Sequence, residues 1–176
     1  MDWDDSLPPL DALSSLDLPA DESDVEPLIE KKSKKKARRR KYWKVAIVGG
    51  GPTRKKAPFR RRSWEIWAFS SRLDRYPRVN RWFELHALKD LKQQLAGKKK
   101  GRRSFKNYMR FMRRLRCPVY MQKRHRRIPC SVPFPLRAVL RRFGRIFTST
   151  ASYMIALAIM EGYKVIGLWG VDLKGK

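Results

Sequence analysis

Acidic residues are scarce over most of this chain. The 176 residues include 43 Lys and Arg but only 16 Asp and Glu, and ten of these acids lie within the first thirty residues. Residues 31–176 therefore carry a formal charge of +37. Six carboxylates are a small supply for acid–base catalysis, and we expect no dedicated metal site. A body this basic attracts polyanions, whatever its fold.

Cysteines and long apolar runs are also rare. Cys117 and Cys130 are the only cysteines, and without a CxxC pair they do not predict a zinc site. No apolar run approaches the roughly 20 residues of a membrane span, and the acidic start is unlike a signal peptide. No nucleophile elbow is present. We therefore predict a cytoplasmic protein without a membrane partner.

Two charged segments precede the first apolar run. Residues 1–30 mix Asp, Glu, Ser and Pro with isolated leucines, a composition that predicts a disordered acidic tail. Residues 31–43 form a basic linker that begins KKSKKKARRRK, and such blocks often bind nucleic acid. The candidate contacts in this arm are Lys34, Lys35, Lys36, Arg38, Arg39 and Arg40.

From residue 44 onward, short apolar runs alternate with helical patterns. We predict strands at 44–48, 64–69, 81–85, 119–122 and 164–169. We predict helices at 87–96, 104–116, 135–143 and 148–161. Because the strands are apolar throughout, they indicate a mostly parallel sheet with helices on both faces. The fold class is therefore α/β, doubly wound and Rossmann-like, in one domain spanning 44–176.

Ligands of such sheets bind beyond the carboxyl ends of the strands. The glycine-rich turn at 49–53 would let backbone N–H groups approach a phosphate, or it is simply a tight turn. The helix start at 148–150 offers unpaired N–H groups to an anion, or its hydroxyls only cap the helix.

Three residues at strand ends are weak catalytic candidates. Glu84 and His86 follow the third strand, and Asp172 follows the last. A lone residue of this kind is more often structural. Asp172 could nevertheless hold Mg²⁺ together with the phosphates of a bound nucleotide.

Basic helix faces support a second interpretation, in which the chain binds nucleic acid without sequence specificity. Arg110 and Arg113 lie on one predicted helix, and Arg137 and Arg141 on another. Aromatic side chains near these cations would stack on bases or belong to the core. They are Trp64, Trp67, Tyr76 and Trp82.

Six segments carry a characteristic order and spacing: VAIVGGGPTRKKAPF, WEIWAFSS, YPRVNRWFELH, CPVYMQ, IPCSVPFPL and FGRIFTSTASYMIALAIMEGYKVIGLWGVDL. In these segments the chain resembles a bacteriophage group of Rossmann-like proteins of unassigned function. At the first loop, the TS helix start and the GVD strand end, that group is similar to bacterial sialyltransferases and archaeal hydroxymethylpterin pyrophosphokinases.

The resemblance implies binding of a nucleotide or sugar nucleotide at the carboxyl edge of the sheet, with transferase-like chemistry. The positions it points to are Gly49, Gly51, Pro52, Ser70, Thr148, Ser149, Gly170 and Asp172. The sialyltransferases have asparagines where this chain has Gly50 and Ser70. These families also continue beyond the position of Lys176, so we expect a domain that is incomplete for catalysis.

A phage origin would place the protein in the cytoplasm of the bacterial host or in the virion. In the virion, it would act as a structural or interaction protein.

Overall fold

The computed structural model describes residues 42–69, 76–96 and 104–171. The predicted acidic tail and the candidate contacts of the basic arm lie outside these residues. Ser70 and Asp172 also lie outside them.

Within the described residues, six strands form one sheet in which every neighbouring pair is parallel. The strands are β1 (Lys44–Val48), β2 (Trp64–Ala68), β3 (Arg81–Phe83), β4 (Val119–Met121), β5 (Ser131–Pro133) and β6 (Val165–Trp169). Their order is β5-β4-β3-β2-β1-β6. The predicted α/β fold with a parallel sheet is confirmed.

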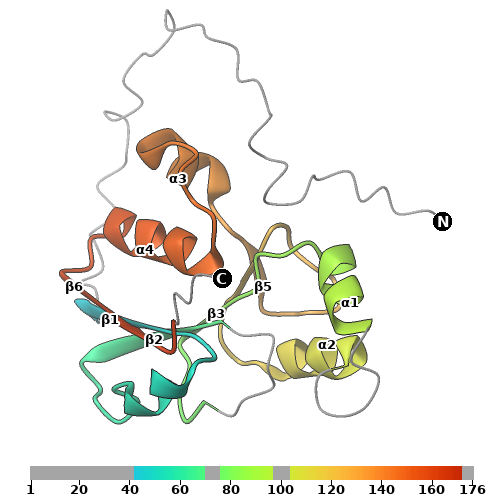
Figure 1. The fold of residues 1–176 in the computed structure, drawn as a ribbon, viewed down its shortest axis with the longest axis horizontal. Coiled ribbons are helices and arrows are strands. Elements are labelled where there is room, and N and C mark those ends of the chain that lie inside the picture. The colour runs from blue at the N-terminus through green and yellow to red at the C-terminus, as the bar shows by residue number, and fades with distance from the viewer. Residues whose placement is uncertain (1–41, 70–75, 97–103, 172–176) are drawn as a thin grey trace, which may run out of the picture.

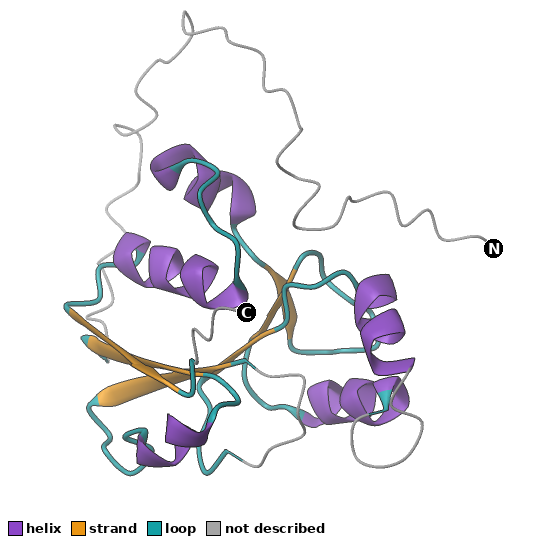
Figure 2. Cartoon of the chain, in the orientation of Figure 1, coloured by secondary structure: helices purple, strands orange, loops and turns teal. Residues whose placement is uncertain are grey.

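Helices cover both faces of this sheet (Figures 1 and 2). The α-helices are α1 (Leu88–Ala96), α2 (Phe105–Arg114), α3 (Leu136–Phe143) and α4 (Thr150–Met160), and a short 3₁₀ helix, η2 (Pro52–Lys56), follows β1. Alternate side chains of β1 point to opposite faces. Val45 and Ile47 pack with residues of α3 and α4, whereas Ala46 and Val48 lie on the η2 face. A third cluster packs α1 and α2 against β2, β3 and β4.

The strand β5 is absent from the sequence prediction. It is only three residues long and ends at Pro133, which cannot donate a backbone hydrogen bond. Proline is tolerated there because β5 is an edge strand. The predicted third strand is also shorter than expected and ends at Phe83, and the glycine-rich turn continues into η2.

A partly buried cluster of charges ties the sheet to the end of α4. Arg81 donates from Nε to Glu65 Oε1 at 2.7 Å and from Nη1 to Glu161 Oε1 at 2.7 Å. The Tyr163 hydroxyl donates to the other Glu65 oxygen. Burial opposes the charge of Arg81, but the hydrogen bond to Glu161 and the charge of Glu65 outweigh it and raise the pKa of the guanidinium. The Arg81 side chain therefore links Glu65 on β2 to Glu161 at the end of α4.

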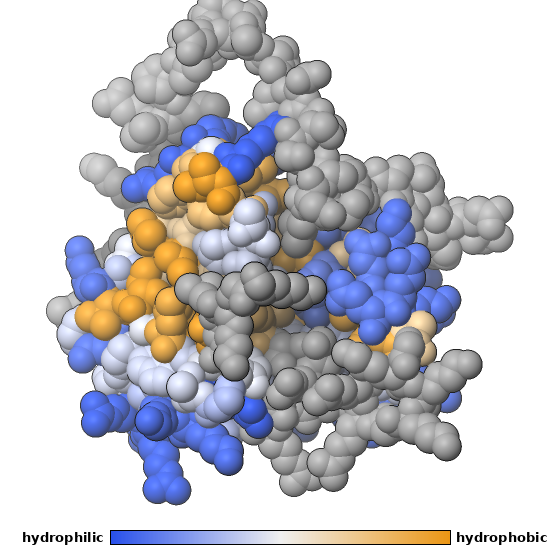
Figure 3. All heavy atoms as spheres, in the orientation of Figure 1, coloured by the Kyte–Doolittle hydropathy of each residue, from blue (hydrophilic) through white to orange (hydrophobic). Residues whose placement is uncertain are grey.

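The edge strand β6 borders an apolar part of the surface. Figure 3 shows orange side chains over β6 and α4, whereas blue side chains gather over α1. Leu168 and Ile159 are both about half exposed, at 47%. Among the helices of the described residues, none combines the length and apolar character needed to cross a bilayer.

Candidate functional site

The strand order reverses between β1 and β6. The chain moves outward from β1 to β5 and then returns to the free edge of β1. Parallel sheets usually bind ligands outside the carboxyl ends of the strands at such a point. The predicted positions Gly49, Gly51 and Gly170 come together here, because Gly49 N–H donates to the Trp169 carbonyl at 2.8 Å and Gly51 N–H to the Gly170 carbonyl at 2.9 Å.

The packing and backbone conformation of the turn also explain why these positions are glycines. A Cβ atom on Gly49 would collide with the carbonyl oxygen of Gly170. Gly170 itself has a φ of +65°, in the region that favours glycine, and its N–H donates to the Thr53 hydroxyl at 2.7 Å. Pro52 opens η2. The loop is therefore a tightly bonded turn, and its role toward a phosphate stays a prediction.

The start of α4 uses its hydroxyls for capping. Ser149 is the N-cap: its Oγ accepts from Ser152 N–H at 3.2 Å, and Ser149 N–H donates to Ser152 Oγ at 3.1 Å. Thr148 precedes the cap and is exposed. Because α4 leads directly into β6, this start lies toward the carboxyl edge of the sheet (Figure 1).

Glu84 and His86, the two catalytic candidates after β3, form a hydrogen-bonded pair. Glu84 Oε1 lies 2.6 Å from His86 Nδ1. Glu84 is 4% exposed, whereas the His86 side chain is 46% exposed. The hydrogen bond to Glu84 outweighs burial and raises the pKa of His86. The imidazole is thus held at one nitrogen and favoured in its protonated form.

Two buried residues, Tyr108 and Trp82, hold the Glu84 side chain in place. Its Oε2 accepts from the Tyr108 hydroxyl of α2 at 2.6 Å. That hydroxyl in turn accepts from Trp82 Nε1 at 3.2 Å. Burial and the neighbouring Glu84 raise the pKa of Tyr108, which therefore stays a hydrogen-bond donor.

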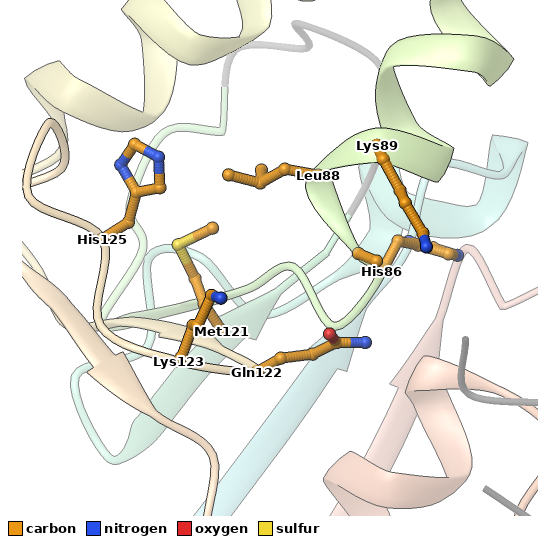
Figure 4. A pocket seen from close by; sticks show the side chains of 8 residues that line it. His86, Leu88, Lys89, Met121, Gln122, Lys123 and His125 are labelled. Carbon is orange, nitrogen blue, oxygen red and sulfur yellow. The ribbon is translucent and has the colours of Figure 1, made fainter. Parts of the chain in front are cut away.

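A small cavity of about 50 Å³ lies next to His86. Its polar lining comes from the start of α1 and from the segment after β4 (Figure 4). These residues are His86, Lys89, Gln122, Lys123 and His125. Burial and the nearby cations Arg127 and Lys123 lower the pKa of His125. The pKa values of the two histidines of this cavity are therefore shifted in opposite directions.

A larger cavity of about 440 Å³ continues along α2. It shares Leu88 and His125 with the small cavity. Its cationic lining residues are Lys106, Arg110, Arg113 and Arg127, and its apolar ones are Leu88, Phe105 and Met109. We call this feature the α2 groove.

As far as the structure describes the chain, the lining of the α2 groove contains no acidic side chain, and the nearest α1 acid in sequence, Asp90, follows the lining residues Leu88 and Lys89. Among the described residues, no Asp or Glu lines either cavity. Glu65 and Glu161 are bound to Arg81 on the other face of the sheet, and Glu84 is bound to Tyr108 and His86. The cationic side chains of the groove therefore face solvent without an acidic partner in its lining.

The structure separates the predicted nucleic-acid contacts. Arg110 and Arg113 line the α2 groove, whereas Arg137 and Arg141 lie on α3, on the opposite face of the sheet. They cannot form one binding surface. Trp67 and Trp82 are fully buried, so for these two residues the alternative that they belong to the core is confirmed.

Sequence reasoning missed the contribution of residues 122–128. Lys123, His125 and Arg127 come from the connection between β4 and β5, and β5 was not predicted. The basic run KRHRR at 123–127 is the signal that could have found them. The fold also leaves no three potential metal ligands together among the described residues.

Comparison with protein-family models, with curated proteins and with solved structures finds no match to this chain.

Proposed function

We propose that this chain binds single-stranded nucleic acid along the α2 groove, with little sequence specificity. The observation that carries the proposal is the lining of the groove, in which four cationic side chains lie alongside three apolar ones. Phosphates release counterions when cationic side chains neutralise them, and this term supplies most non-specific affinity.

The apolar residues of the lining favour a single strand over a duplex. Phe105 and Met109 line the groove together with the basic residues. In a duplex the base faces are stacked inside the helix, whereas a single strand can place them against aromatic and apolar side chains. The combination of cations and apolar surface therefore suits unpaired bases.

The two exposed arginine pairs provide a matched test. Arg110 and Arg113 on α2 line the groove, and Arg137 and Arg141 on α3 serve as the control. Changing either pair to Gln removes the same charge and leaves the basic arm intact. Binding of a labelled oligo(dT) is measured by fluorescence anisotropy at several salt concentrations.

We expect the Arg110→Gln/Arg113→Gln variant to bind more weakly and with a flatter salt dependence. Each lost phosphate contact should reduce the slope of log affinity against log salt by about 0.7 on a single strand. The Arg137→Gln/Arg141→Gln variant should bind like the parent protein. Equal losses in the two variants would mean that net charge, and not the groove, determines the affinity.

A second candidate function is binding of a nucleotide or sugar nucleotide at the carboxyl edge, between β1 and β6. The reversal of strand order there and the nearby start of α4 favour it. A transferase of this kind would use Mg²⁺ with the nucleotide phosphates. Ligand at 100 times its dissociation constant should stabilise the fold by about 2.7 kcal/mol. Thermal unfolding with CMP, CDP, UDP and ATP in low salt tests this, and no shift with any of them would reject it.

A further inference from the structure

The small cavity beside His86 has the size of a phosphate group. A cavity needs about 10–15 Å³ to hold one water molecule. The cavity of about 50 Å³ therefore has room for a handful of non-hydrogen atoms. The α2 groove, at about 440 Å³, is much larger and meets the small cavity at Leu88 and His125.

The lining of this cavity suits a doubly charged anion. His86, which follows β3, and Lys89 on α1 lie together on one side of the cavity, and Lys123 after β4 lines it from the other side (Figure 4). All three residues are exposed. A phosphate monoester carries about −1.5 to −2 charges at neutral pH, more than the single charge of a phosphodiester in the chain.

We propose that this cavity binds the terminal phosphate of a nucleic-acid strand lying in the α2 groove. The inference rests on the proposed function, because the groove must first hold the strand. A terminal phosphate monoester carries more negative charge than an internal phosphodiester, so the basic lining of the cavity favours a strand end.

Glu84 prepares His86 for this role. The carboxylate holds Nδ1 at 2.6 Å, and Tyr108 fixes the carboxylate, so Nε2 is the ring nitrogen available to a ligand. The same contact raises the pKa of His86 and so favours the positively charged ring.

Other ionisable groups act on the same ring. The titratable and charged groups around His86 are Glu84 after β3, Lys89 and Asp90 on α1, Tyr108 on α2, and Lys123 and His125 after β4.

The ionisation of His86 and of the phosphate predicts how the preference for a phosphorylated end depends on pH. The affinity gained from a terminal phosphate should fall as pH rises through the raised pKa of His86, because the ring then loses its proton. It should also fall below about pH 6, where the phosphate monoester takes up a proton. The preference should therefore be greatest between these two limits.

The experiment compares one oligonucleotide sequence with a 5′-phosphate, a 3′-phosphate or hydroxyl groups at both ends. We expect at least one phosphorylated form to bind about tenfold more tightly than the hydroxyl form, as charge-assisted hydrogen bonds allow. His86→Gln and Lys123→Gln should each bring this ratio below about threefold. Because both side chains are exposed, either variant alone suffices if the other does not fold.

The Arg110→Gln/Arg113→Gln variant separates this inference from the proposed function. It should weaken all three oligonucleotides equally and leave the ratio between them unchanged. Equal affinity for phosphate and hydroxyl ends in a protein that binds the strand would overturn the end site alone. A ratio that survives both His86→Gln and Lys123→Gln would also overturn it. Failure of the protein to bind any oligonucleotide would reject the proposed function itself.

Discussion

Replacing Arg81 by Met should strongly destabilise the domain. The guanidinium bonds to both Glu65 and Glu161, and the Glu65 side chain is only 9% exposed. Removing one partner of a buried ion pair costs about 3–5 kcal/mol, because the remaining charge is left uncompensated. The Arg81 and Glu161 side chains are 19% and 23% exposed, so water can reach them and we expect the lower end, about 3 kcal/mol. Urea unfolding followed by tryptophan fluorescence measures this change in the free energy of unfolding.

A second variant tests the reason for the loss. In Arg81→Met/Glu65→Gln, a neutral amide replaces the buried carboxylate. The amide oxygen can still accept one hydrogen bond from Tyr163 or Trp67, the present donors to Glu65. The double variant should therefore be more stable than Arg81→Met alone. A single-variant loss below about 1 kcal/mol, or a double variant that is less stable still, would refute the argument.

Three further predictions concern the candidate site and its supports. Tyr108→Phe removes the hydroxyl that donates to buried Glu84 and should cost about 1–3 kcal/mol in urea unfolding; an unchanged midpoint would contradict the hydrogen-bond chain. Ser149→Ala removes the cap of α4 and should cost about 0.5–2 kcal/mol by the same measurement, whereas Ser149→Gly should cost only a few tenths. His86 has a raised pKa when folded, so its stabilising contribution should be complete below about pH 6.5 and disappear as pH rises through the folded value. The melting temperatures of the parent and His86→Gln should therefore converge at high pH, and a constant difference would contradict this assignment.

Most of the sheet could be predicted because its strands are continuous apolar runs. Residues 44–48 have no polar side chain after Lys44, which is typical of a strand buried on both faces. The run SVP at β5 gave no such signal, because three residues ending in proline do not resemble a strand. Its place in the sheet comes from pairing with β4, which is a tertiary contact.

Part of the candidate site could also be predicted from position. Glu84 and His86 follow a strand and are two residues apart, so an extended backbone places them on the same side. Their contact with α2 depends on how that helix packs, and no local pattern specifies this. The α2 groove likewise needs Arg110 and Arg127 from segments on either side of β4. The basic character of these segments was clear from the sequence, but the sequence did not show that they line the same groove.

The place of β6 has a consequence for how the chain folds. Lys44 at the start of β1 pairs with Val165, so the partner for one edge of this apolar strand is supplied only after all the other strands have been made. Contacts this distant in sequence are slow to form, and the edge of β1 is prone to aggregation until β6 pairs with it. A fragment that ends before β6 would thus expose β1 permanently. For recombinant production, the residues of β6 should be kept, and slow synthesis at low temperature should raise the soluble yield.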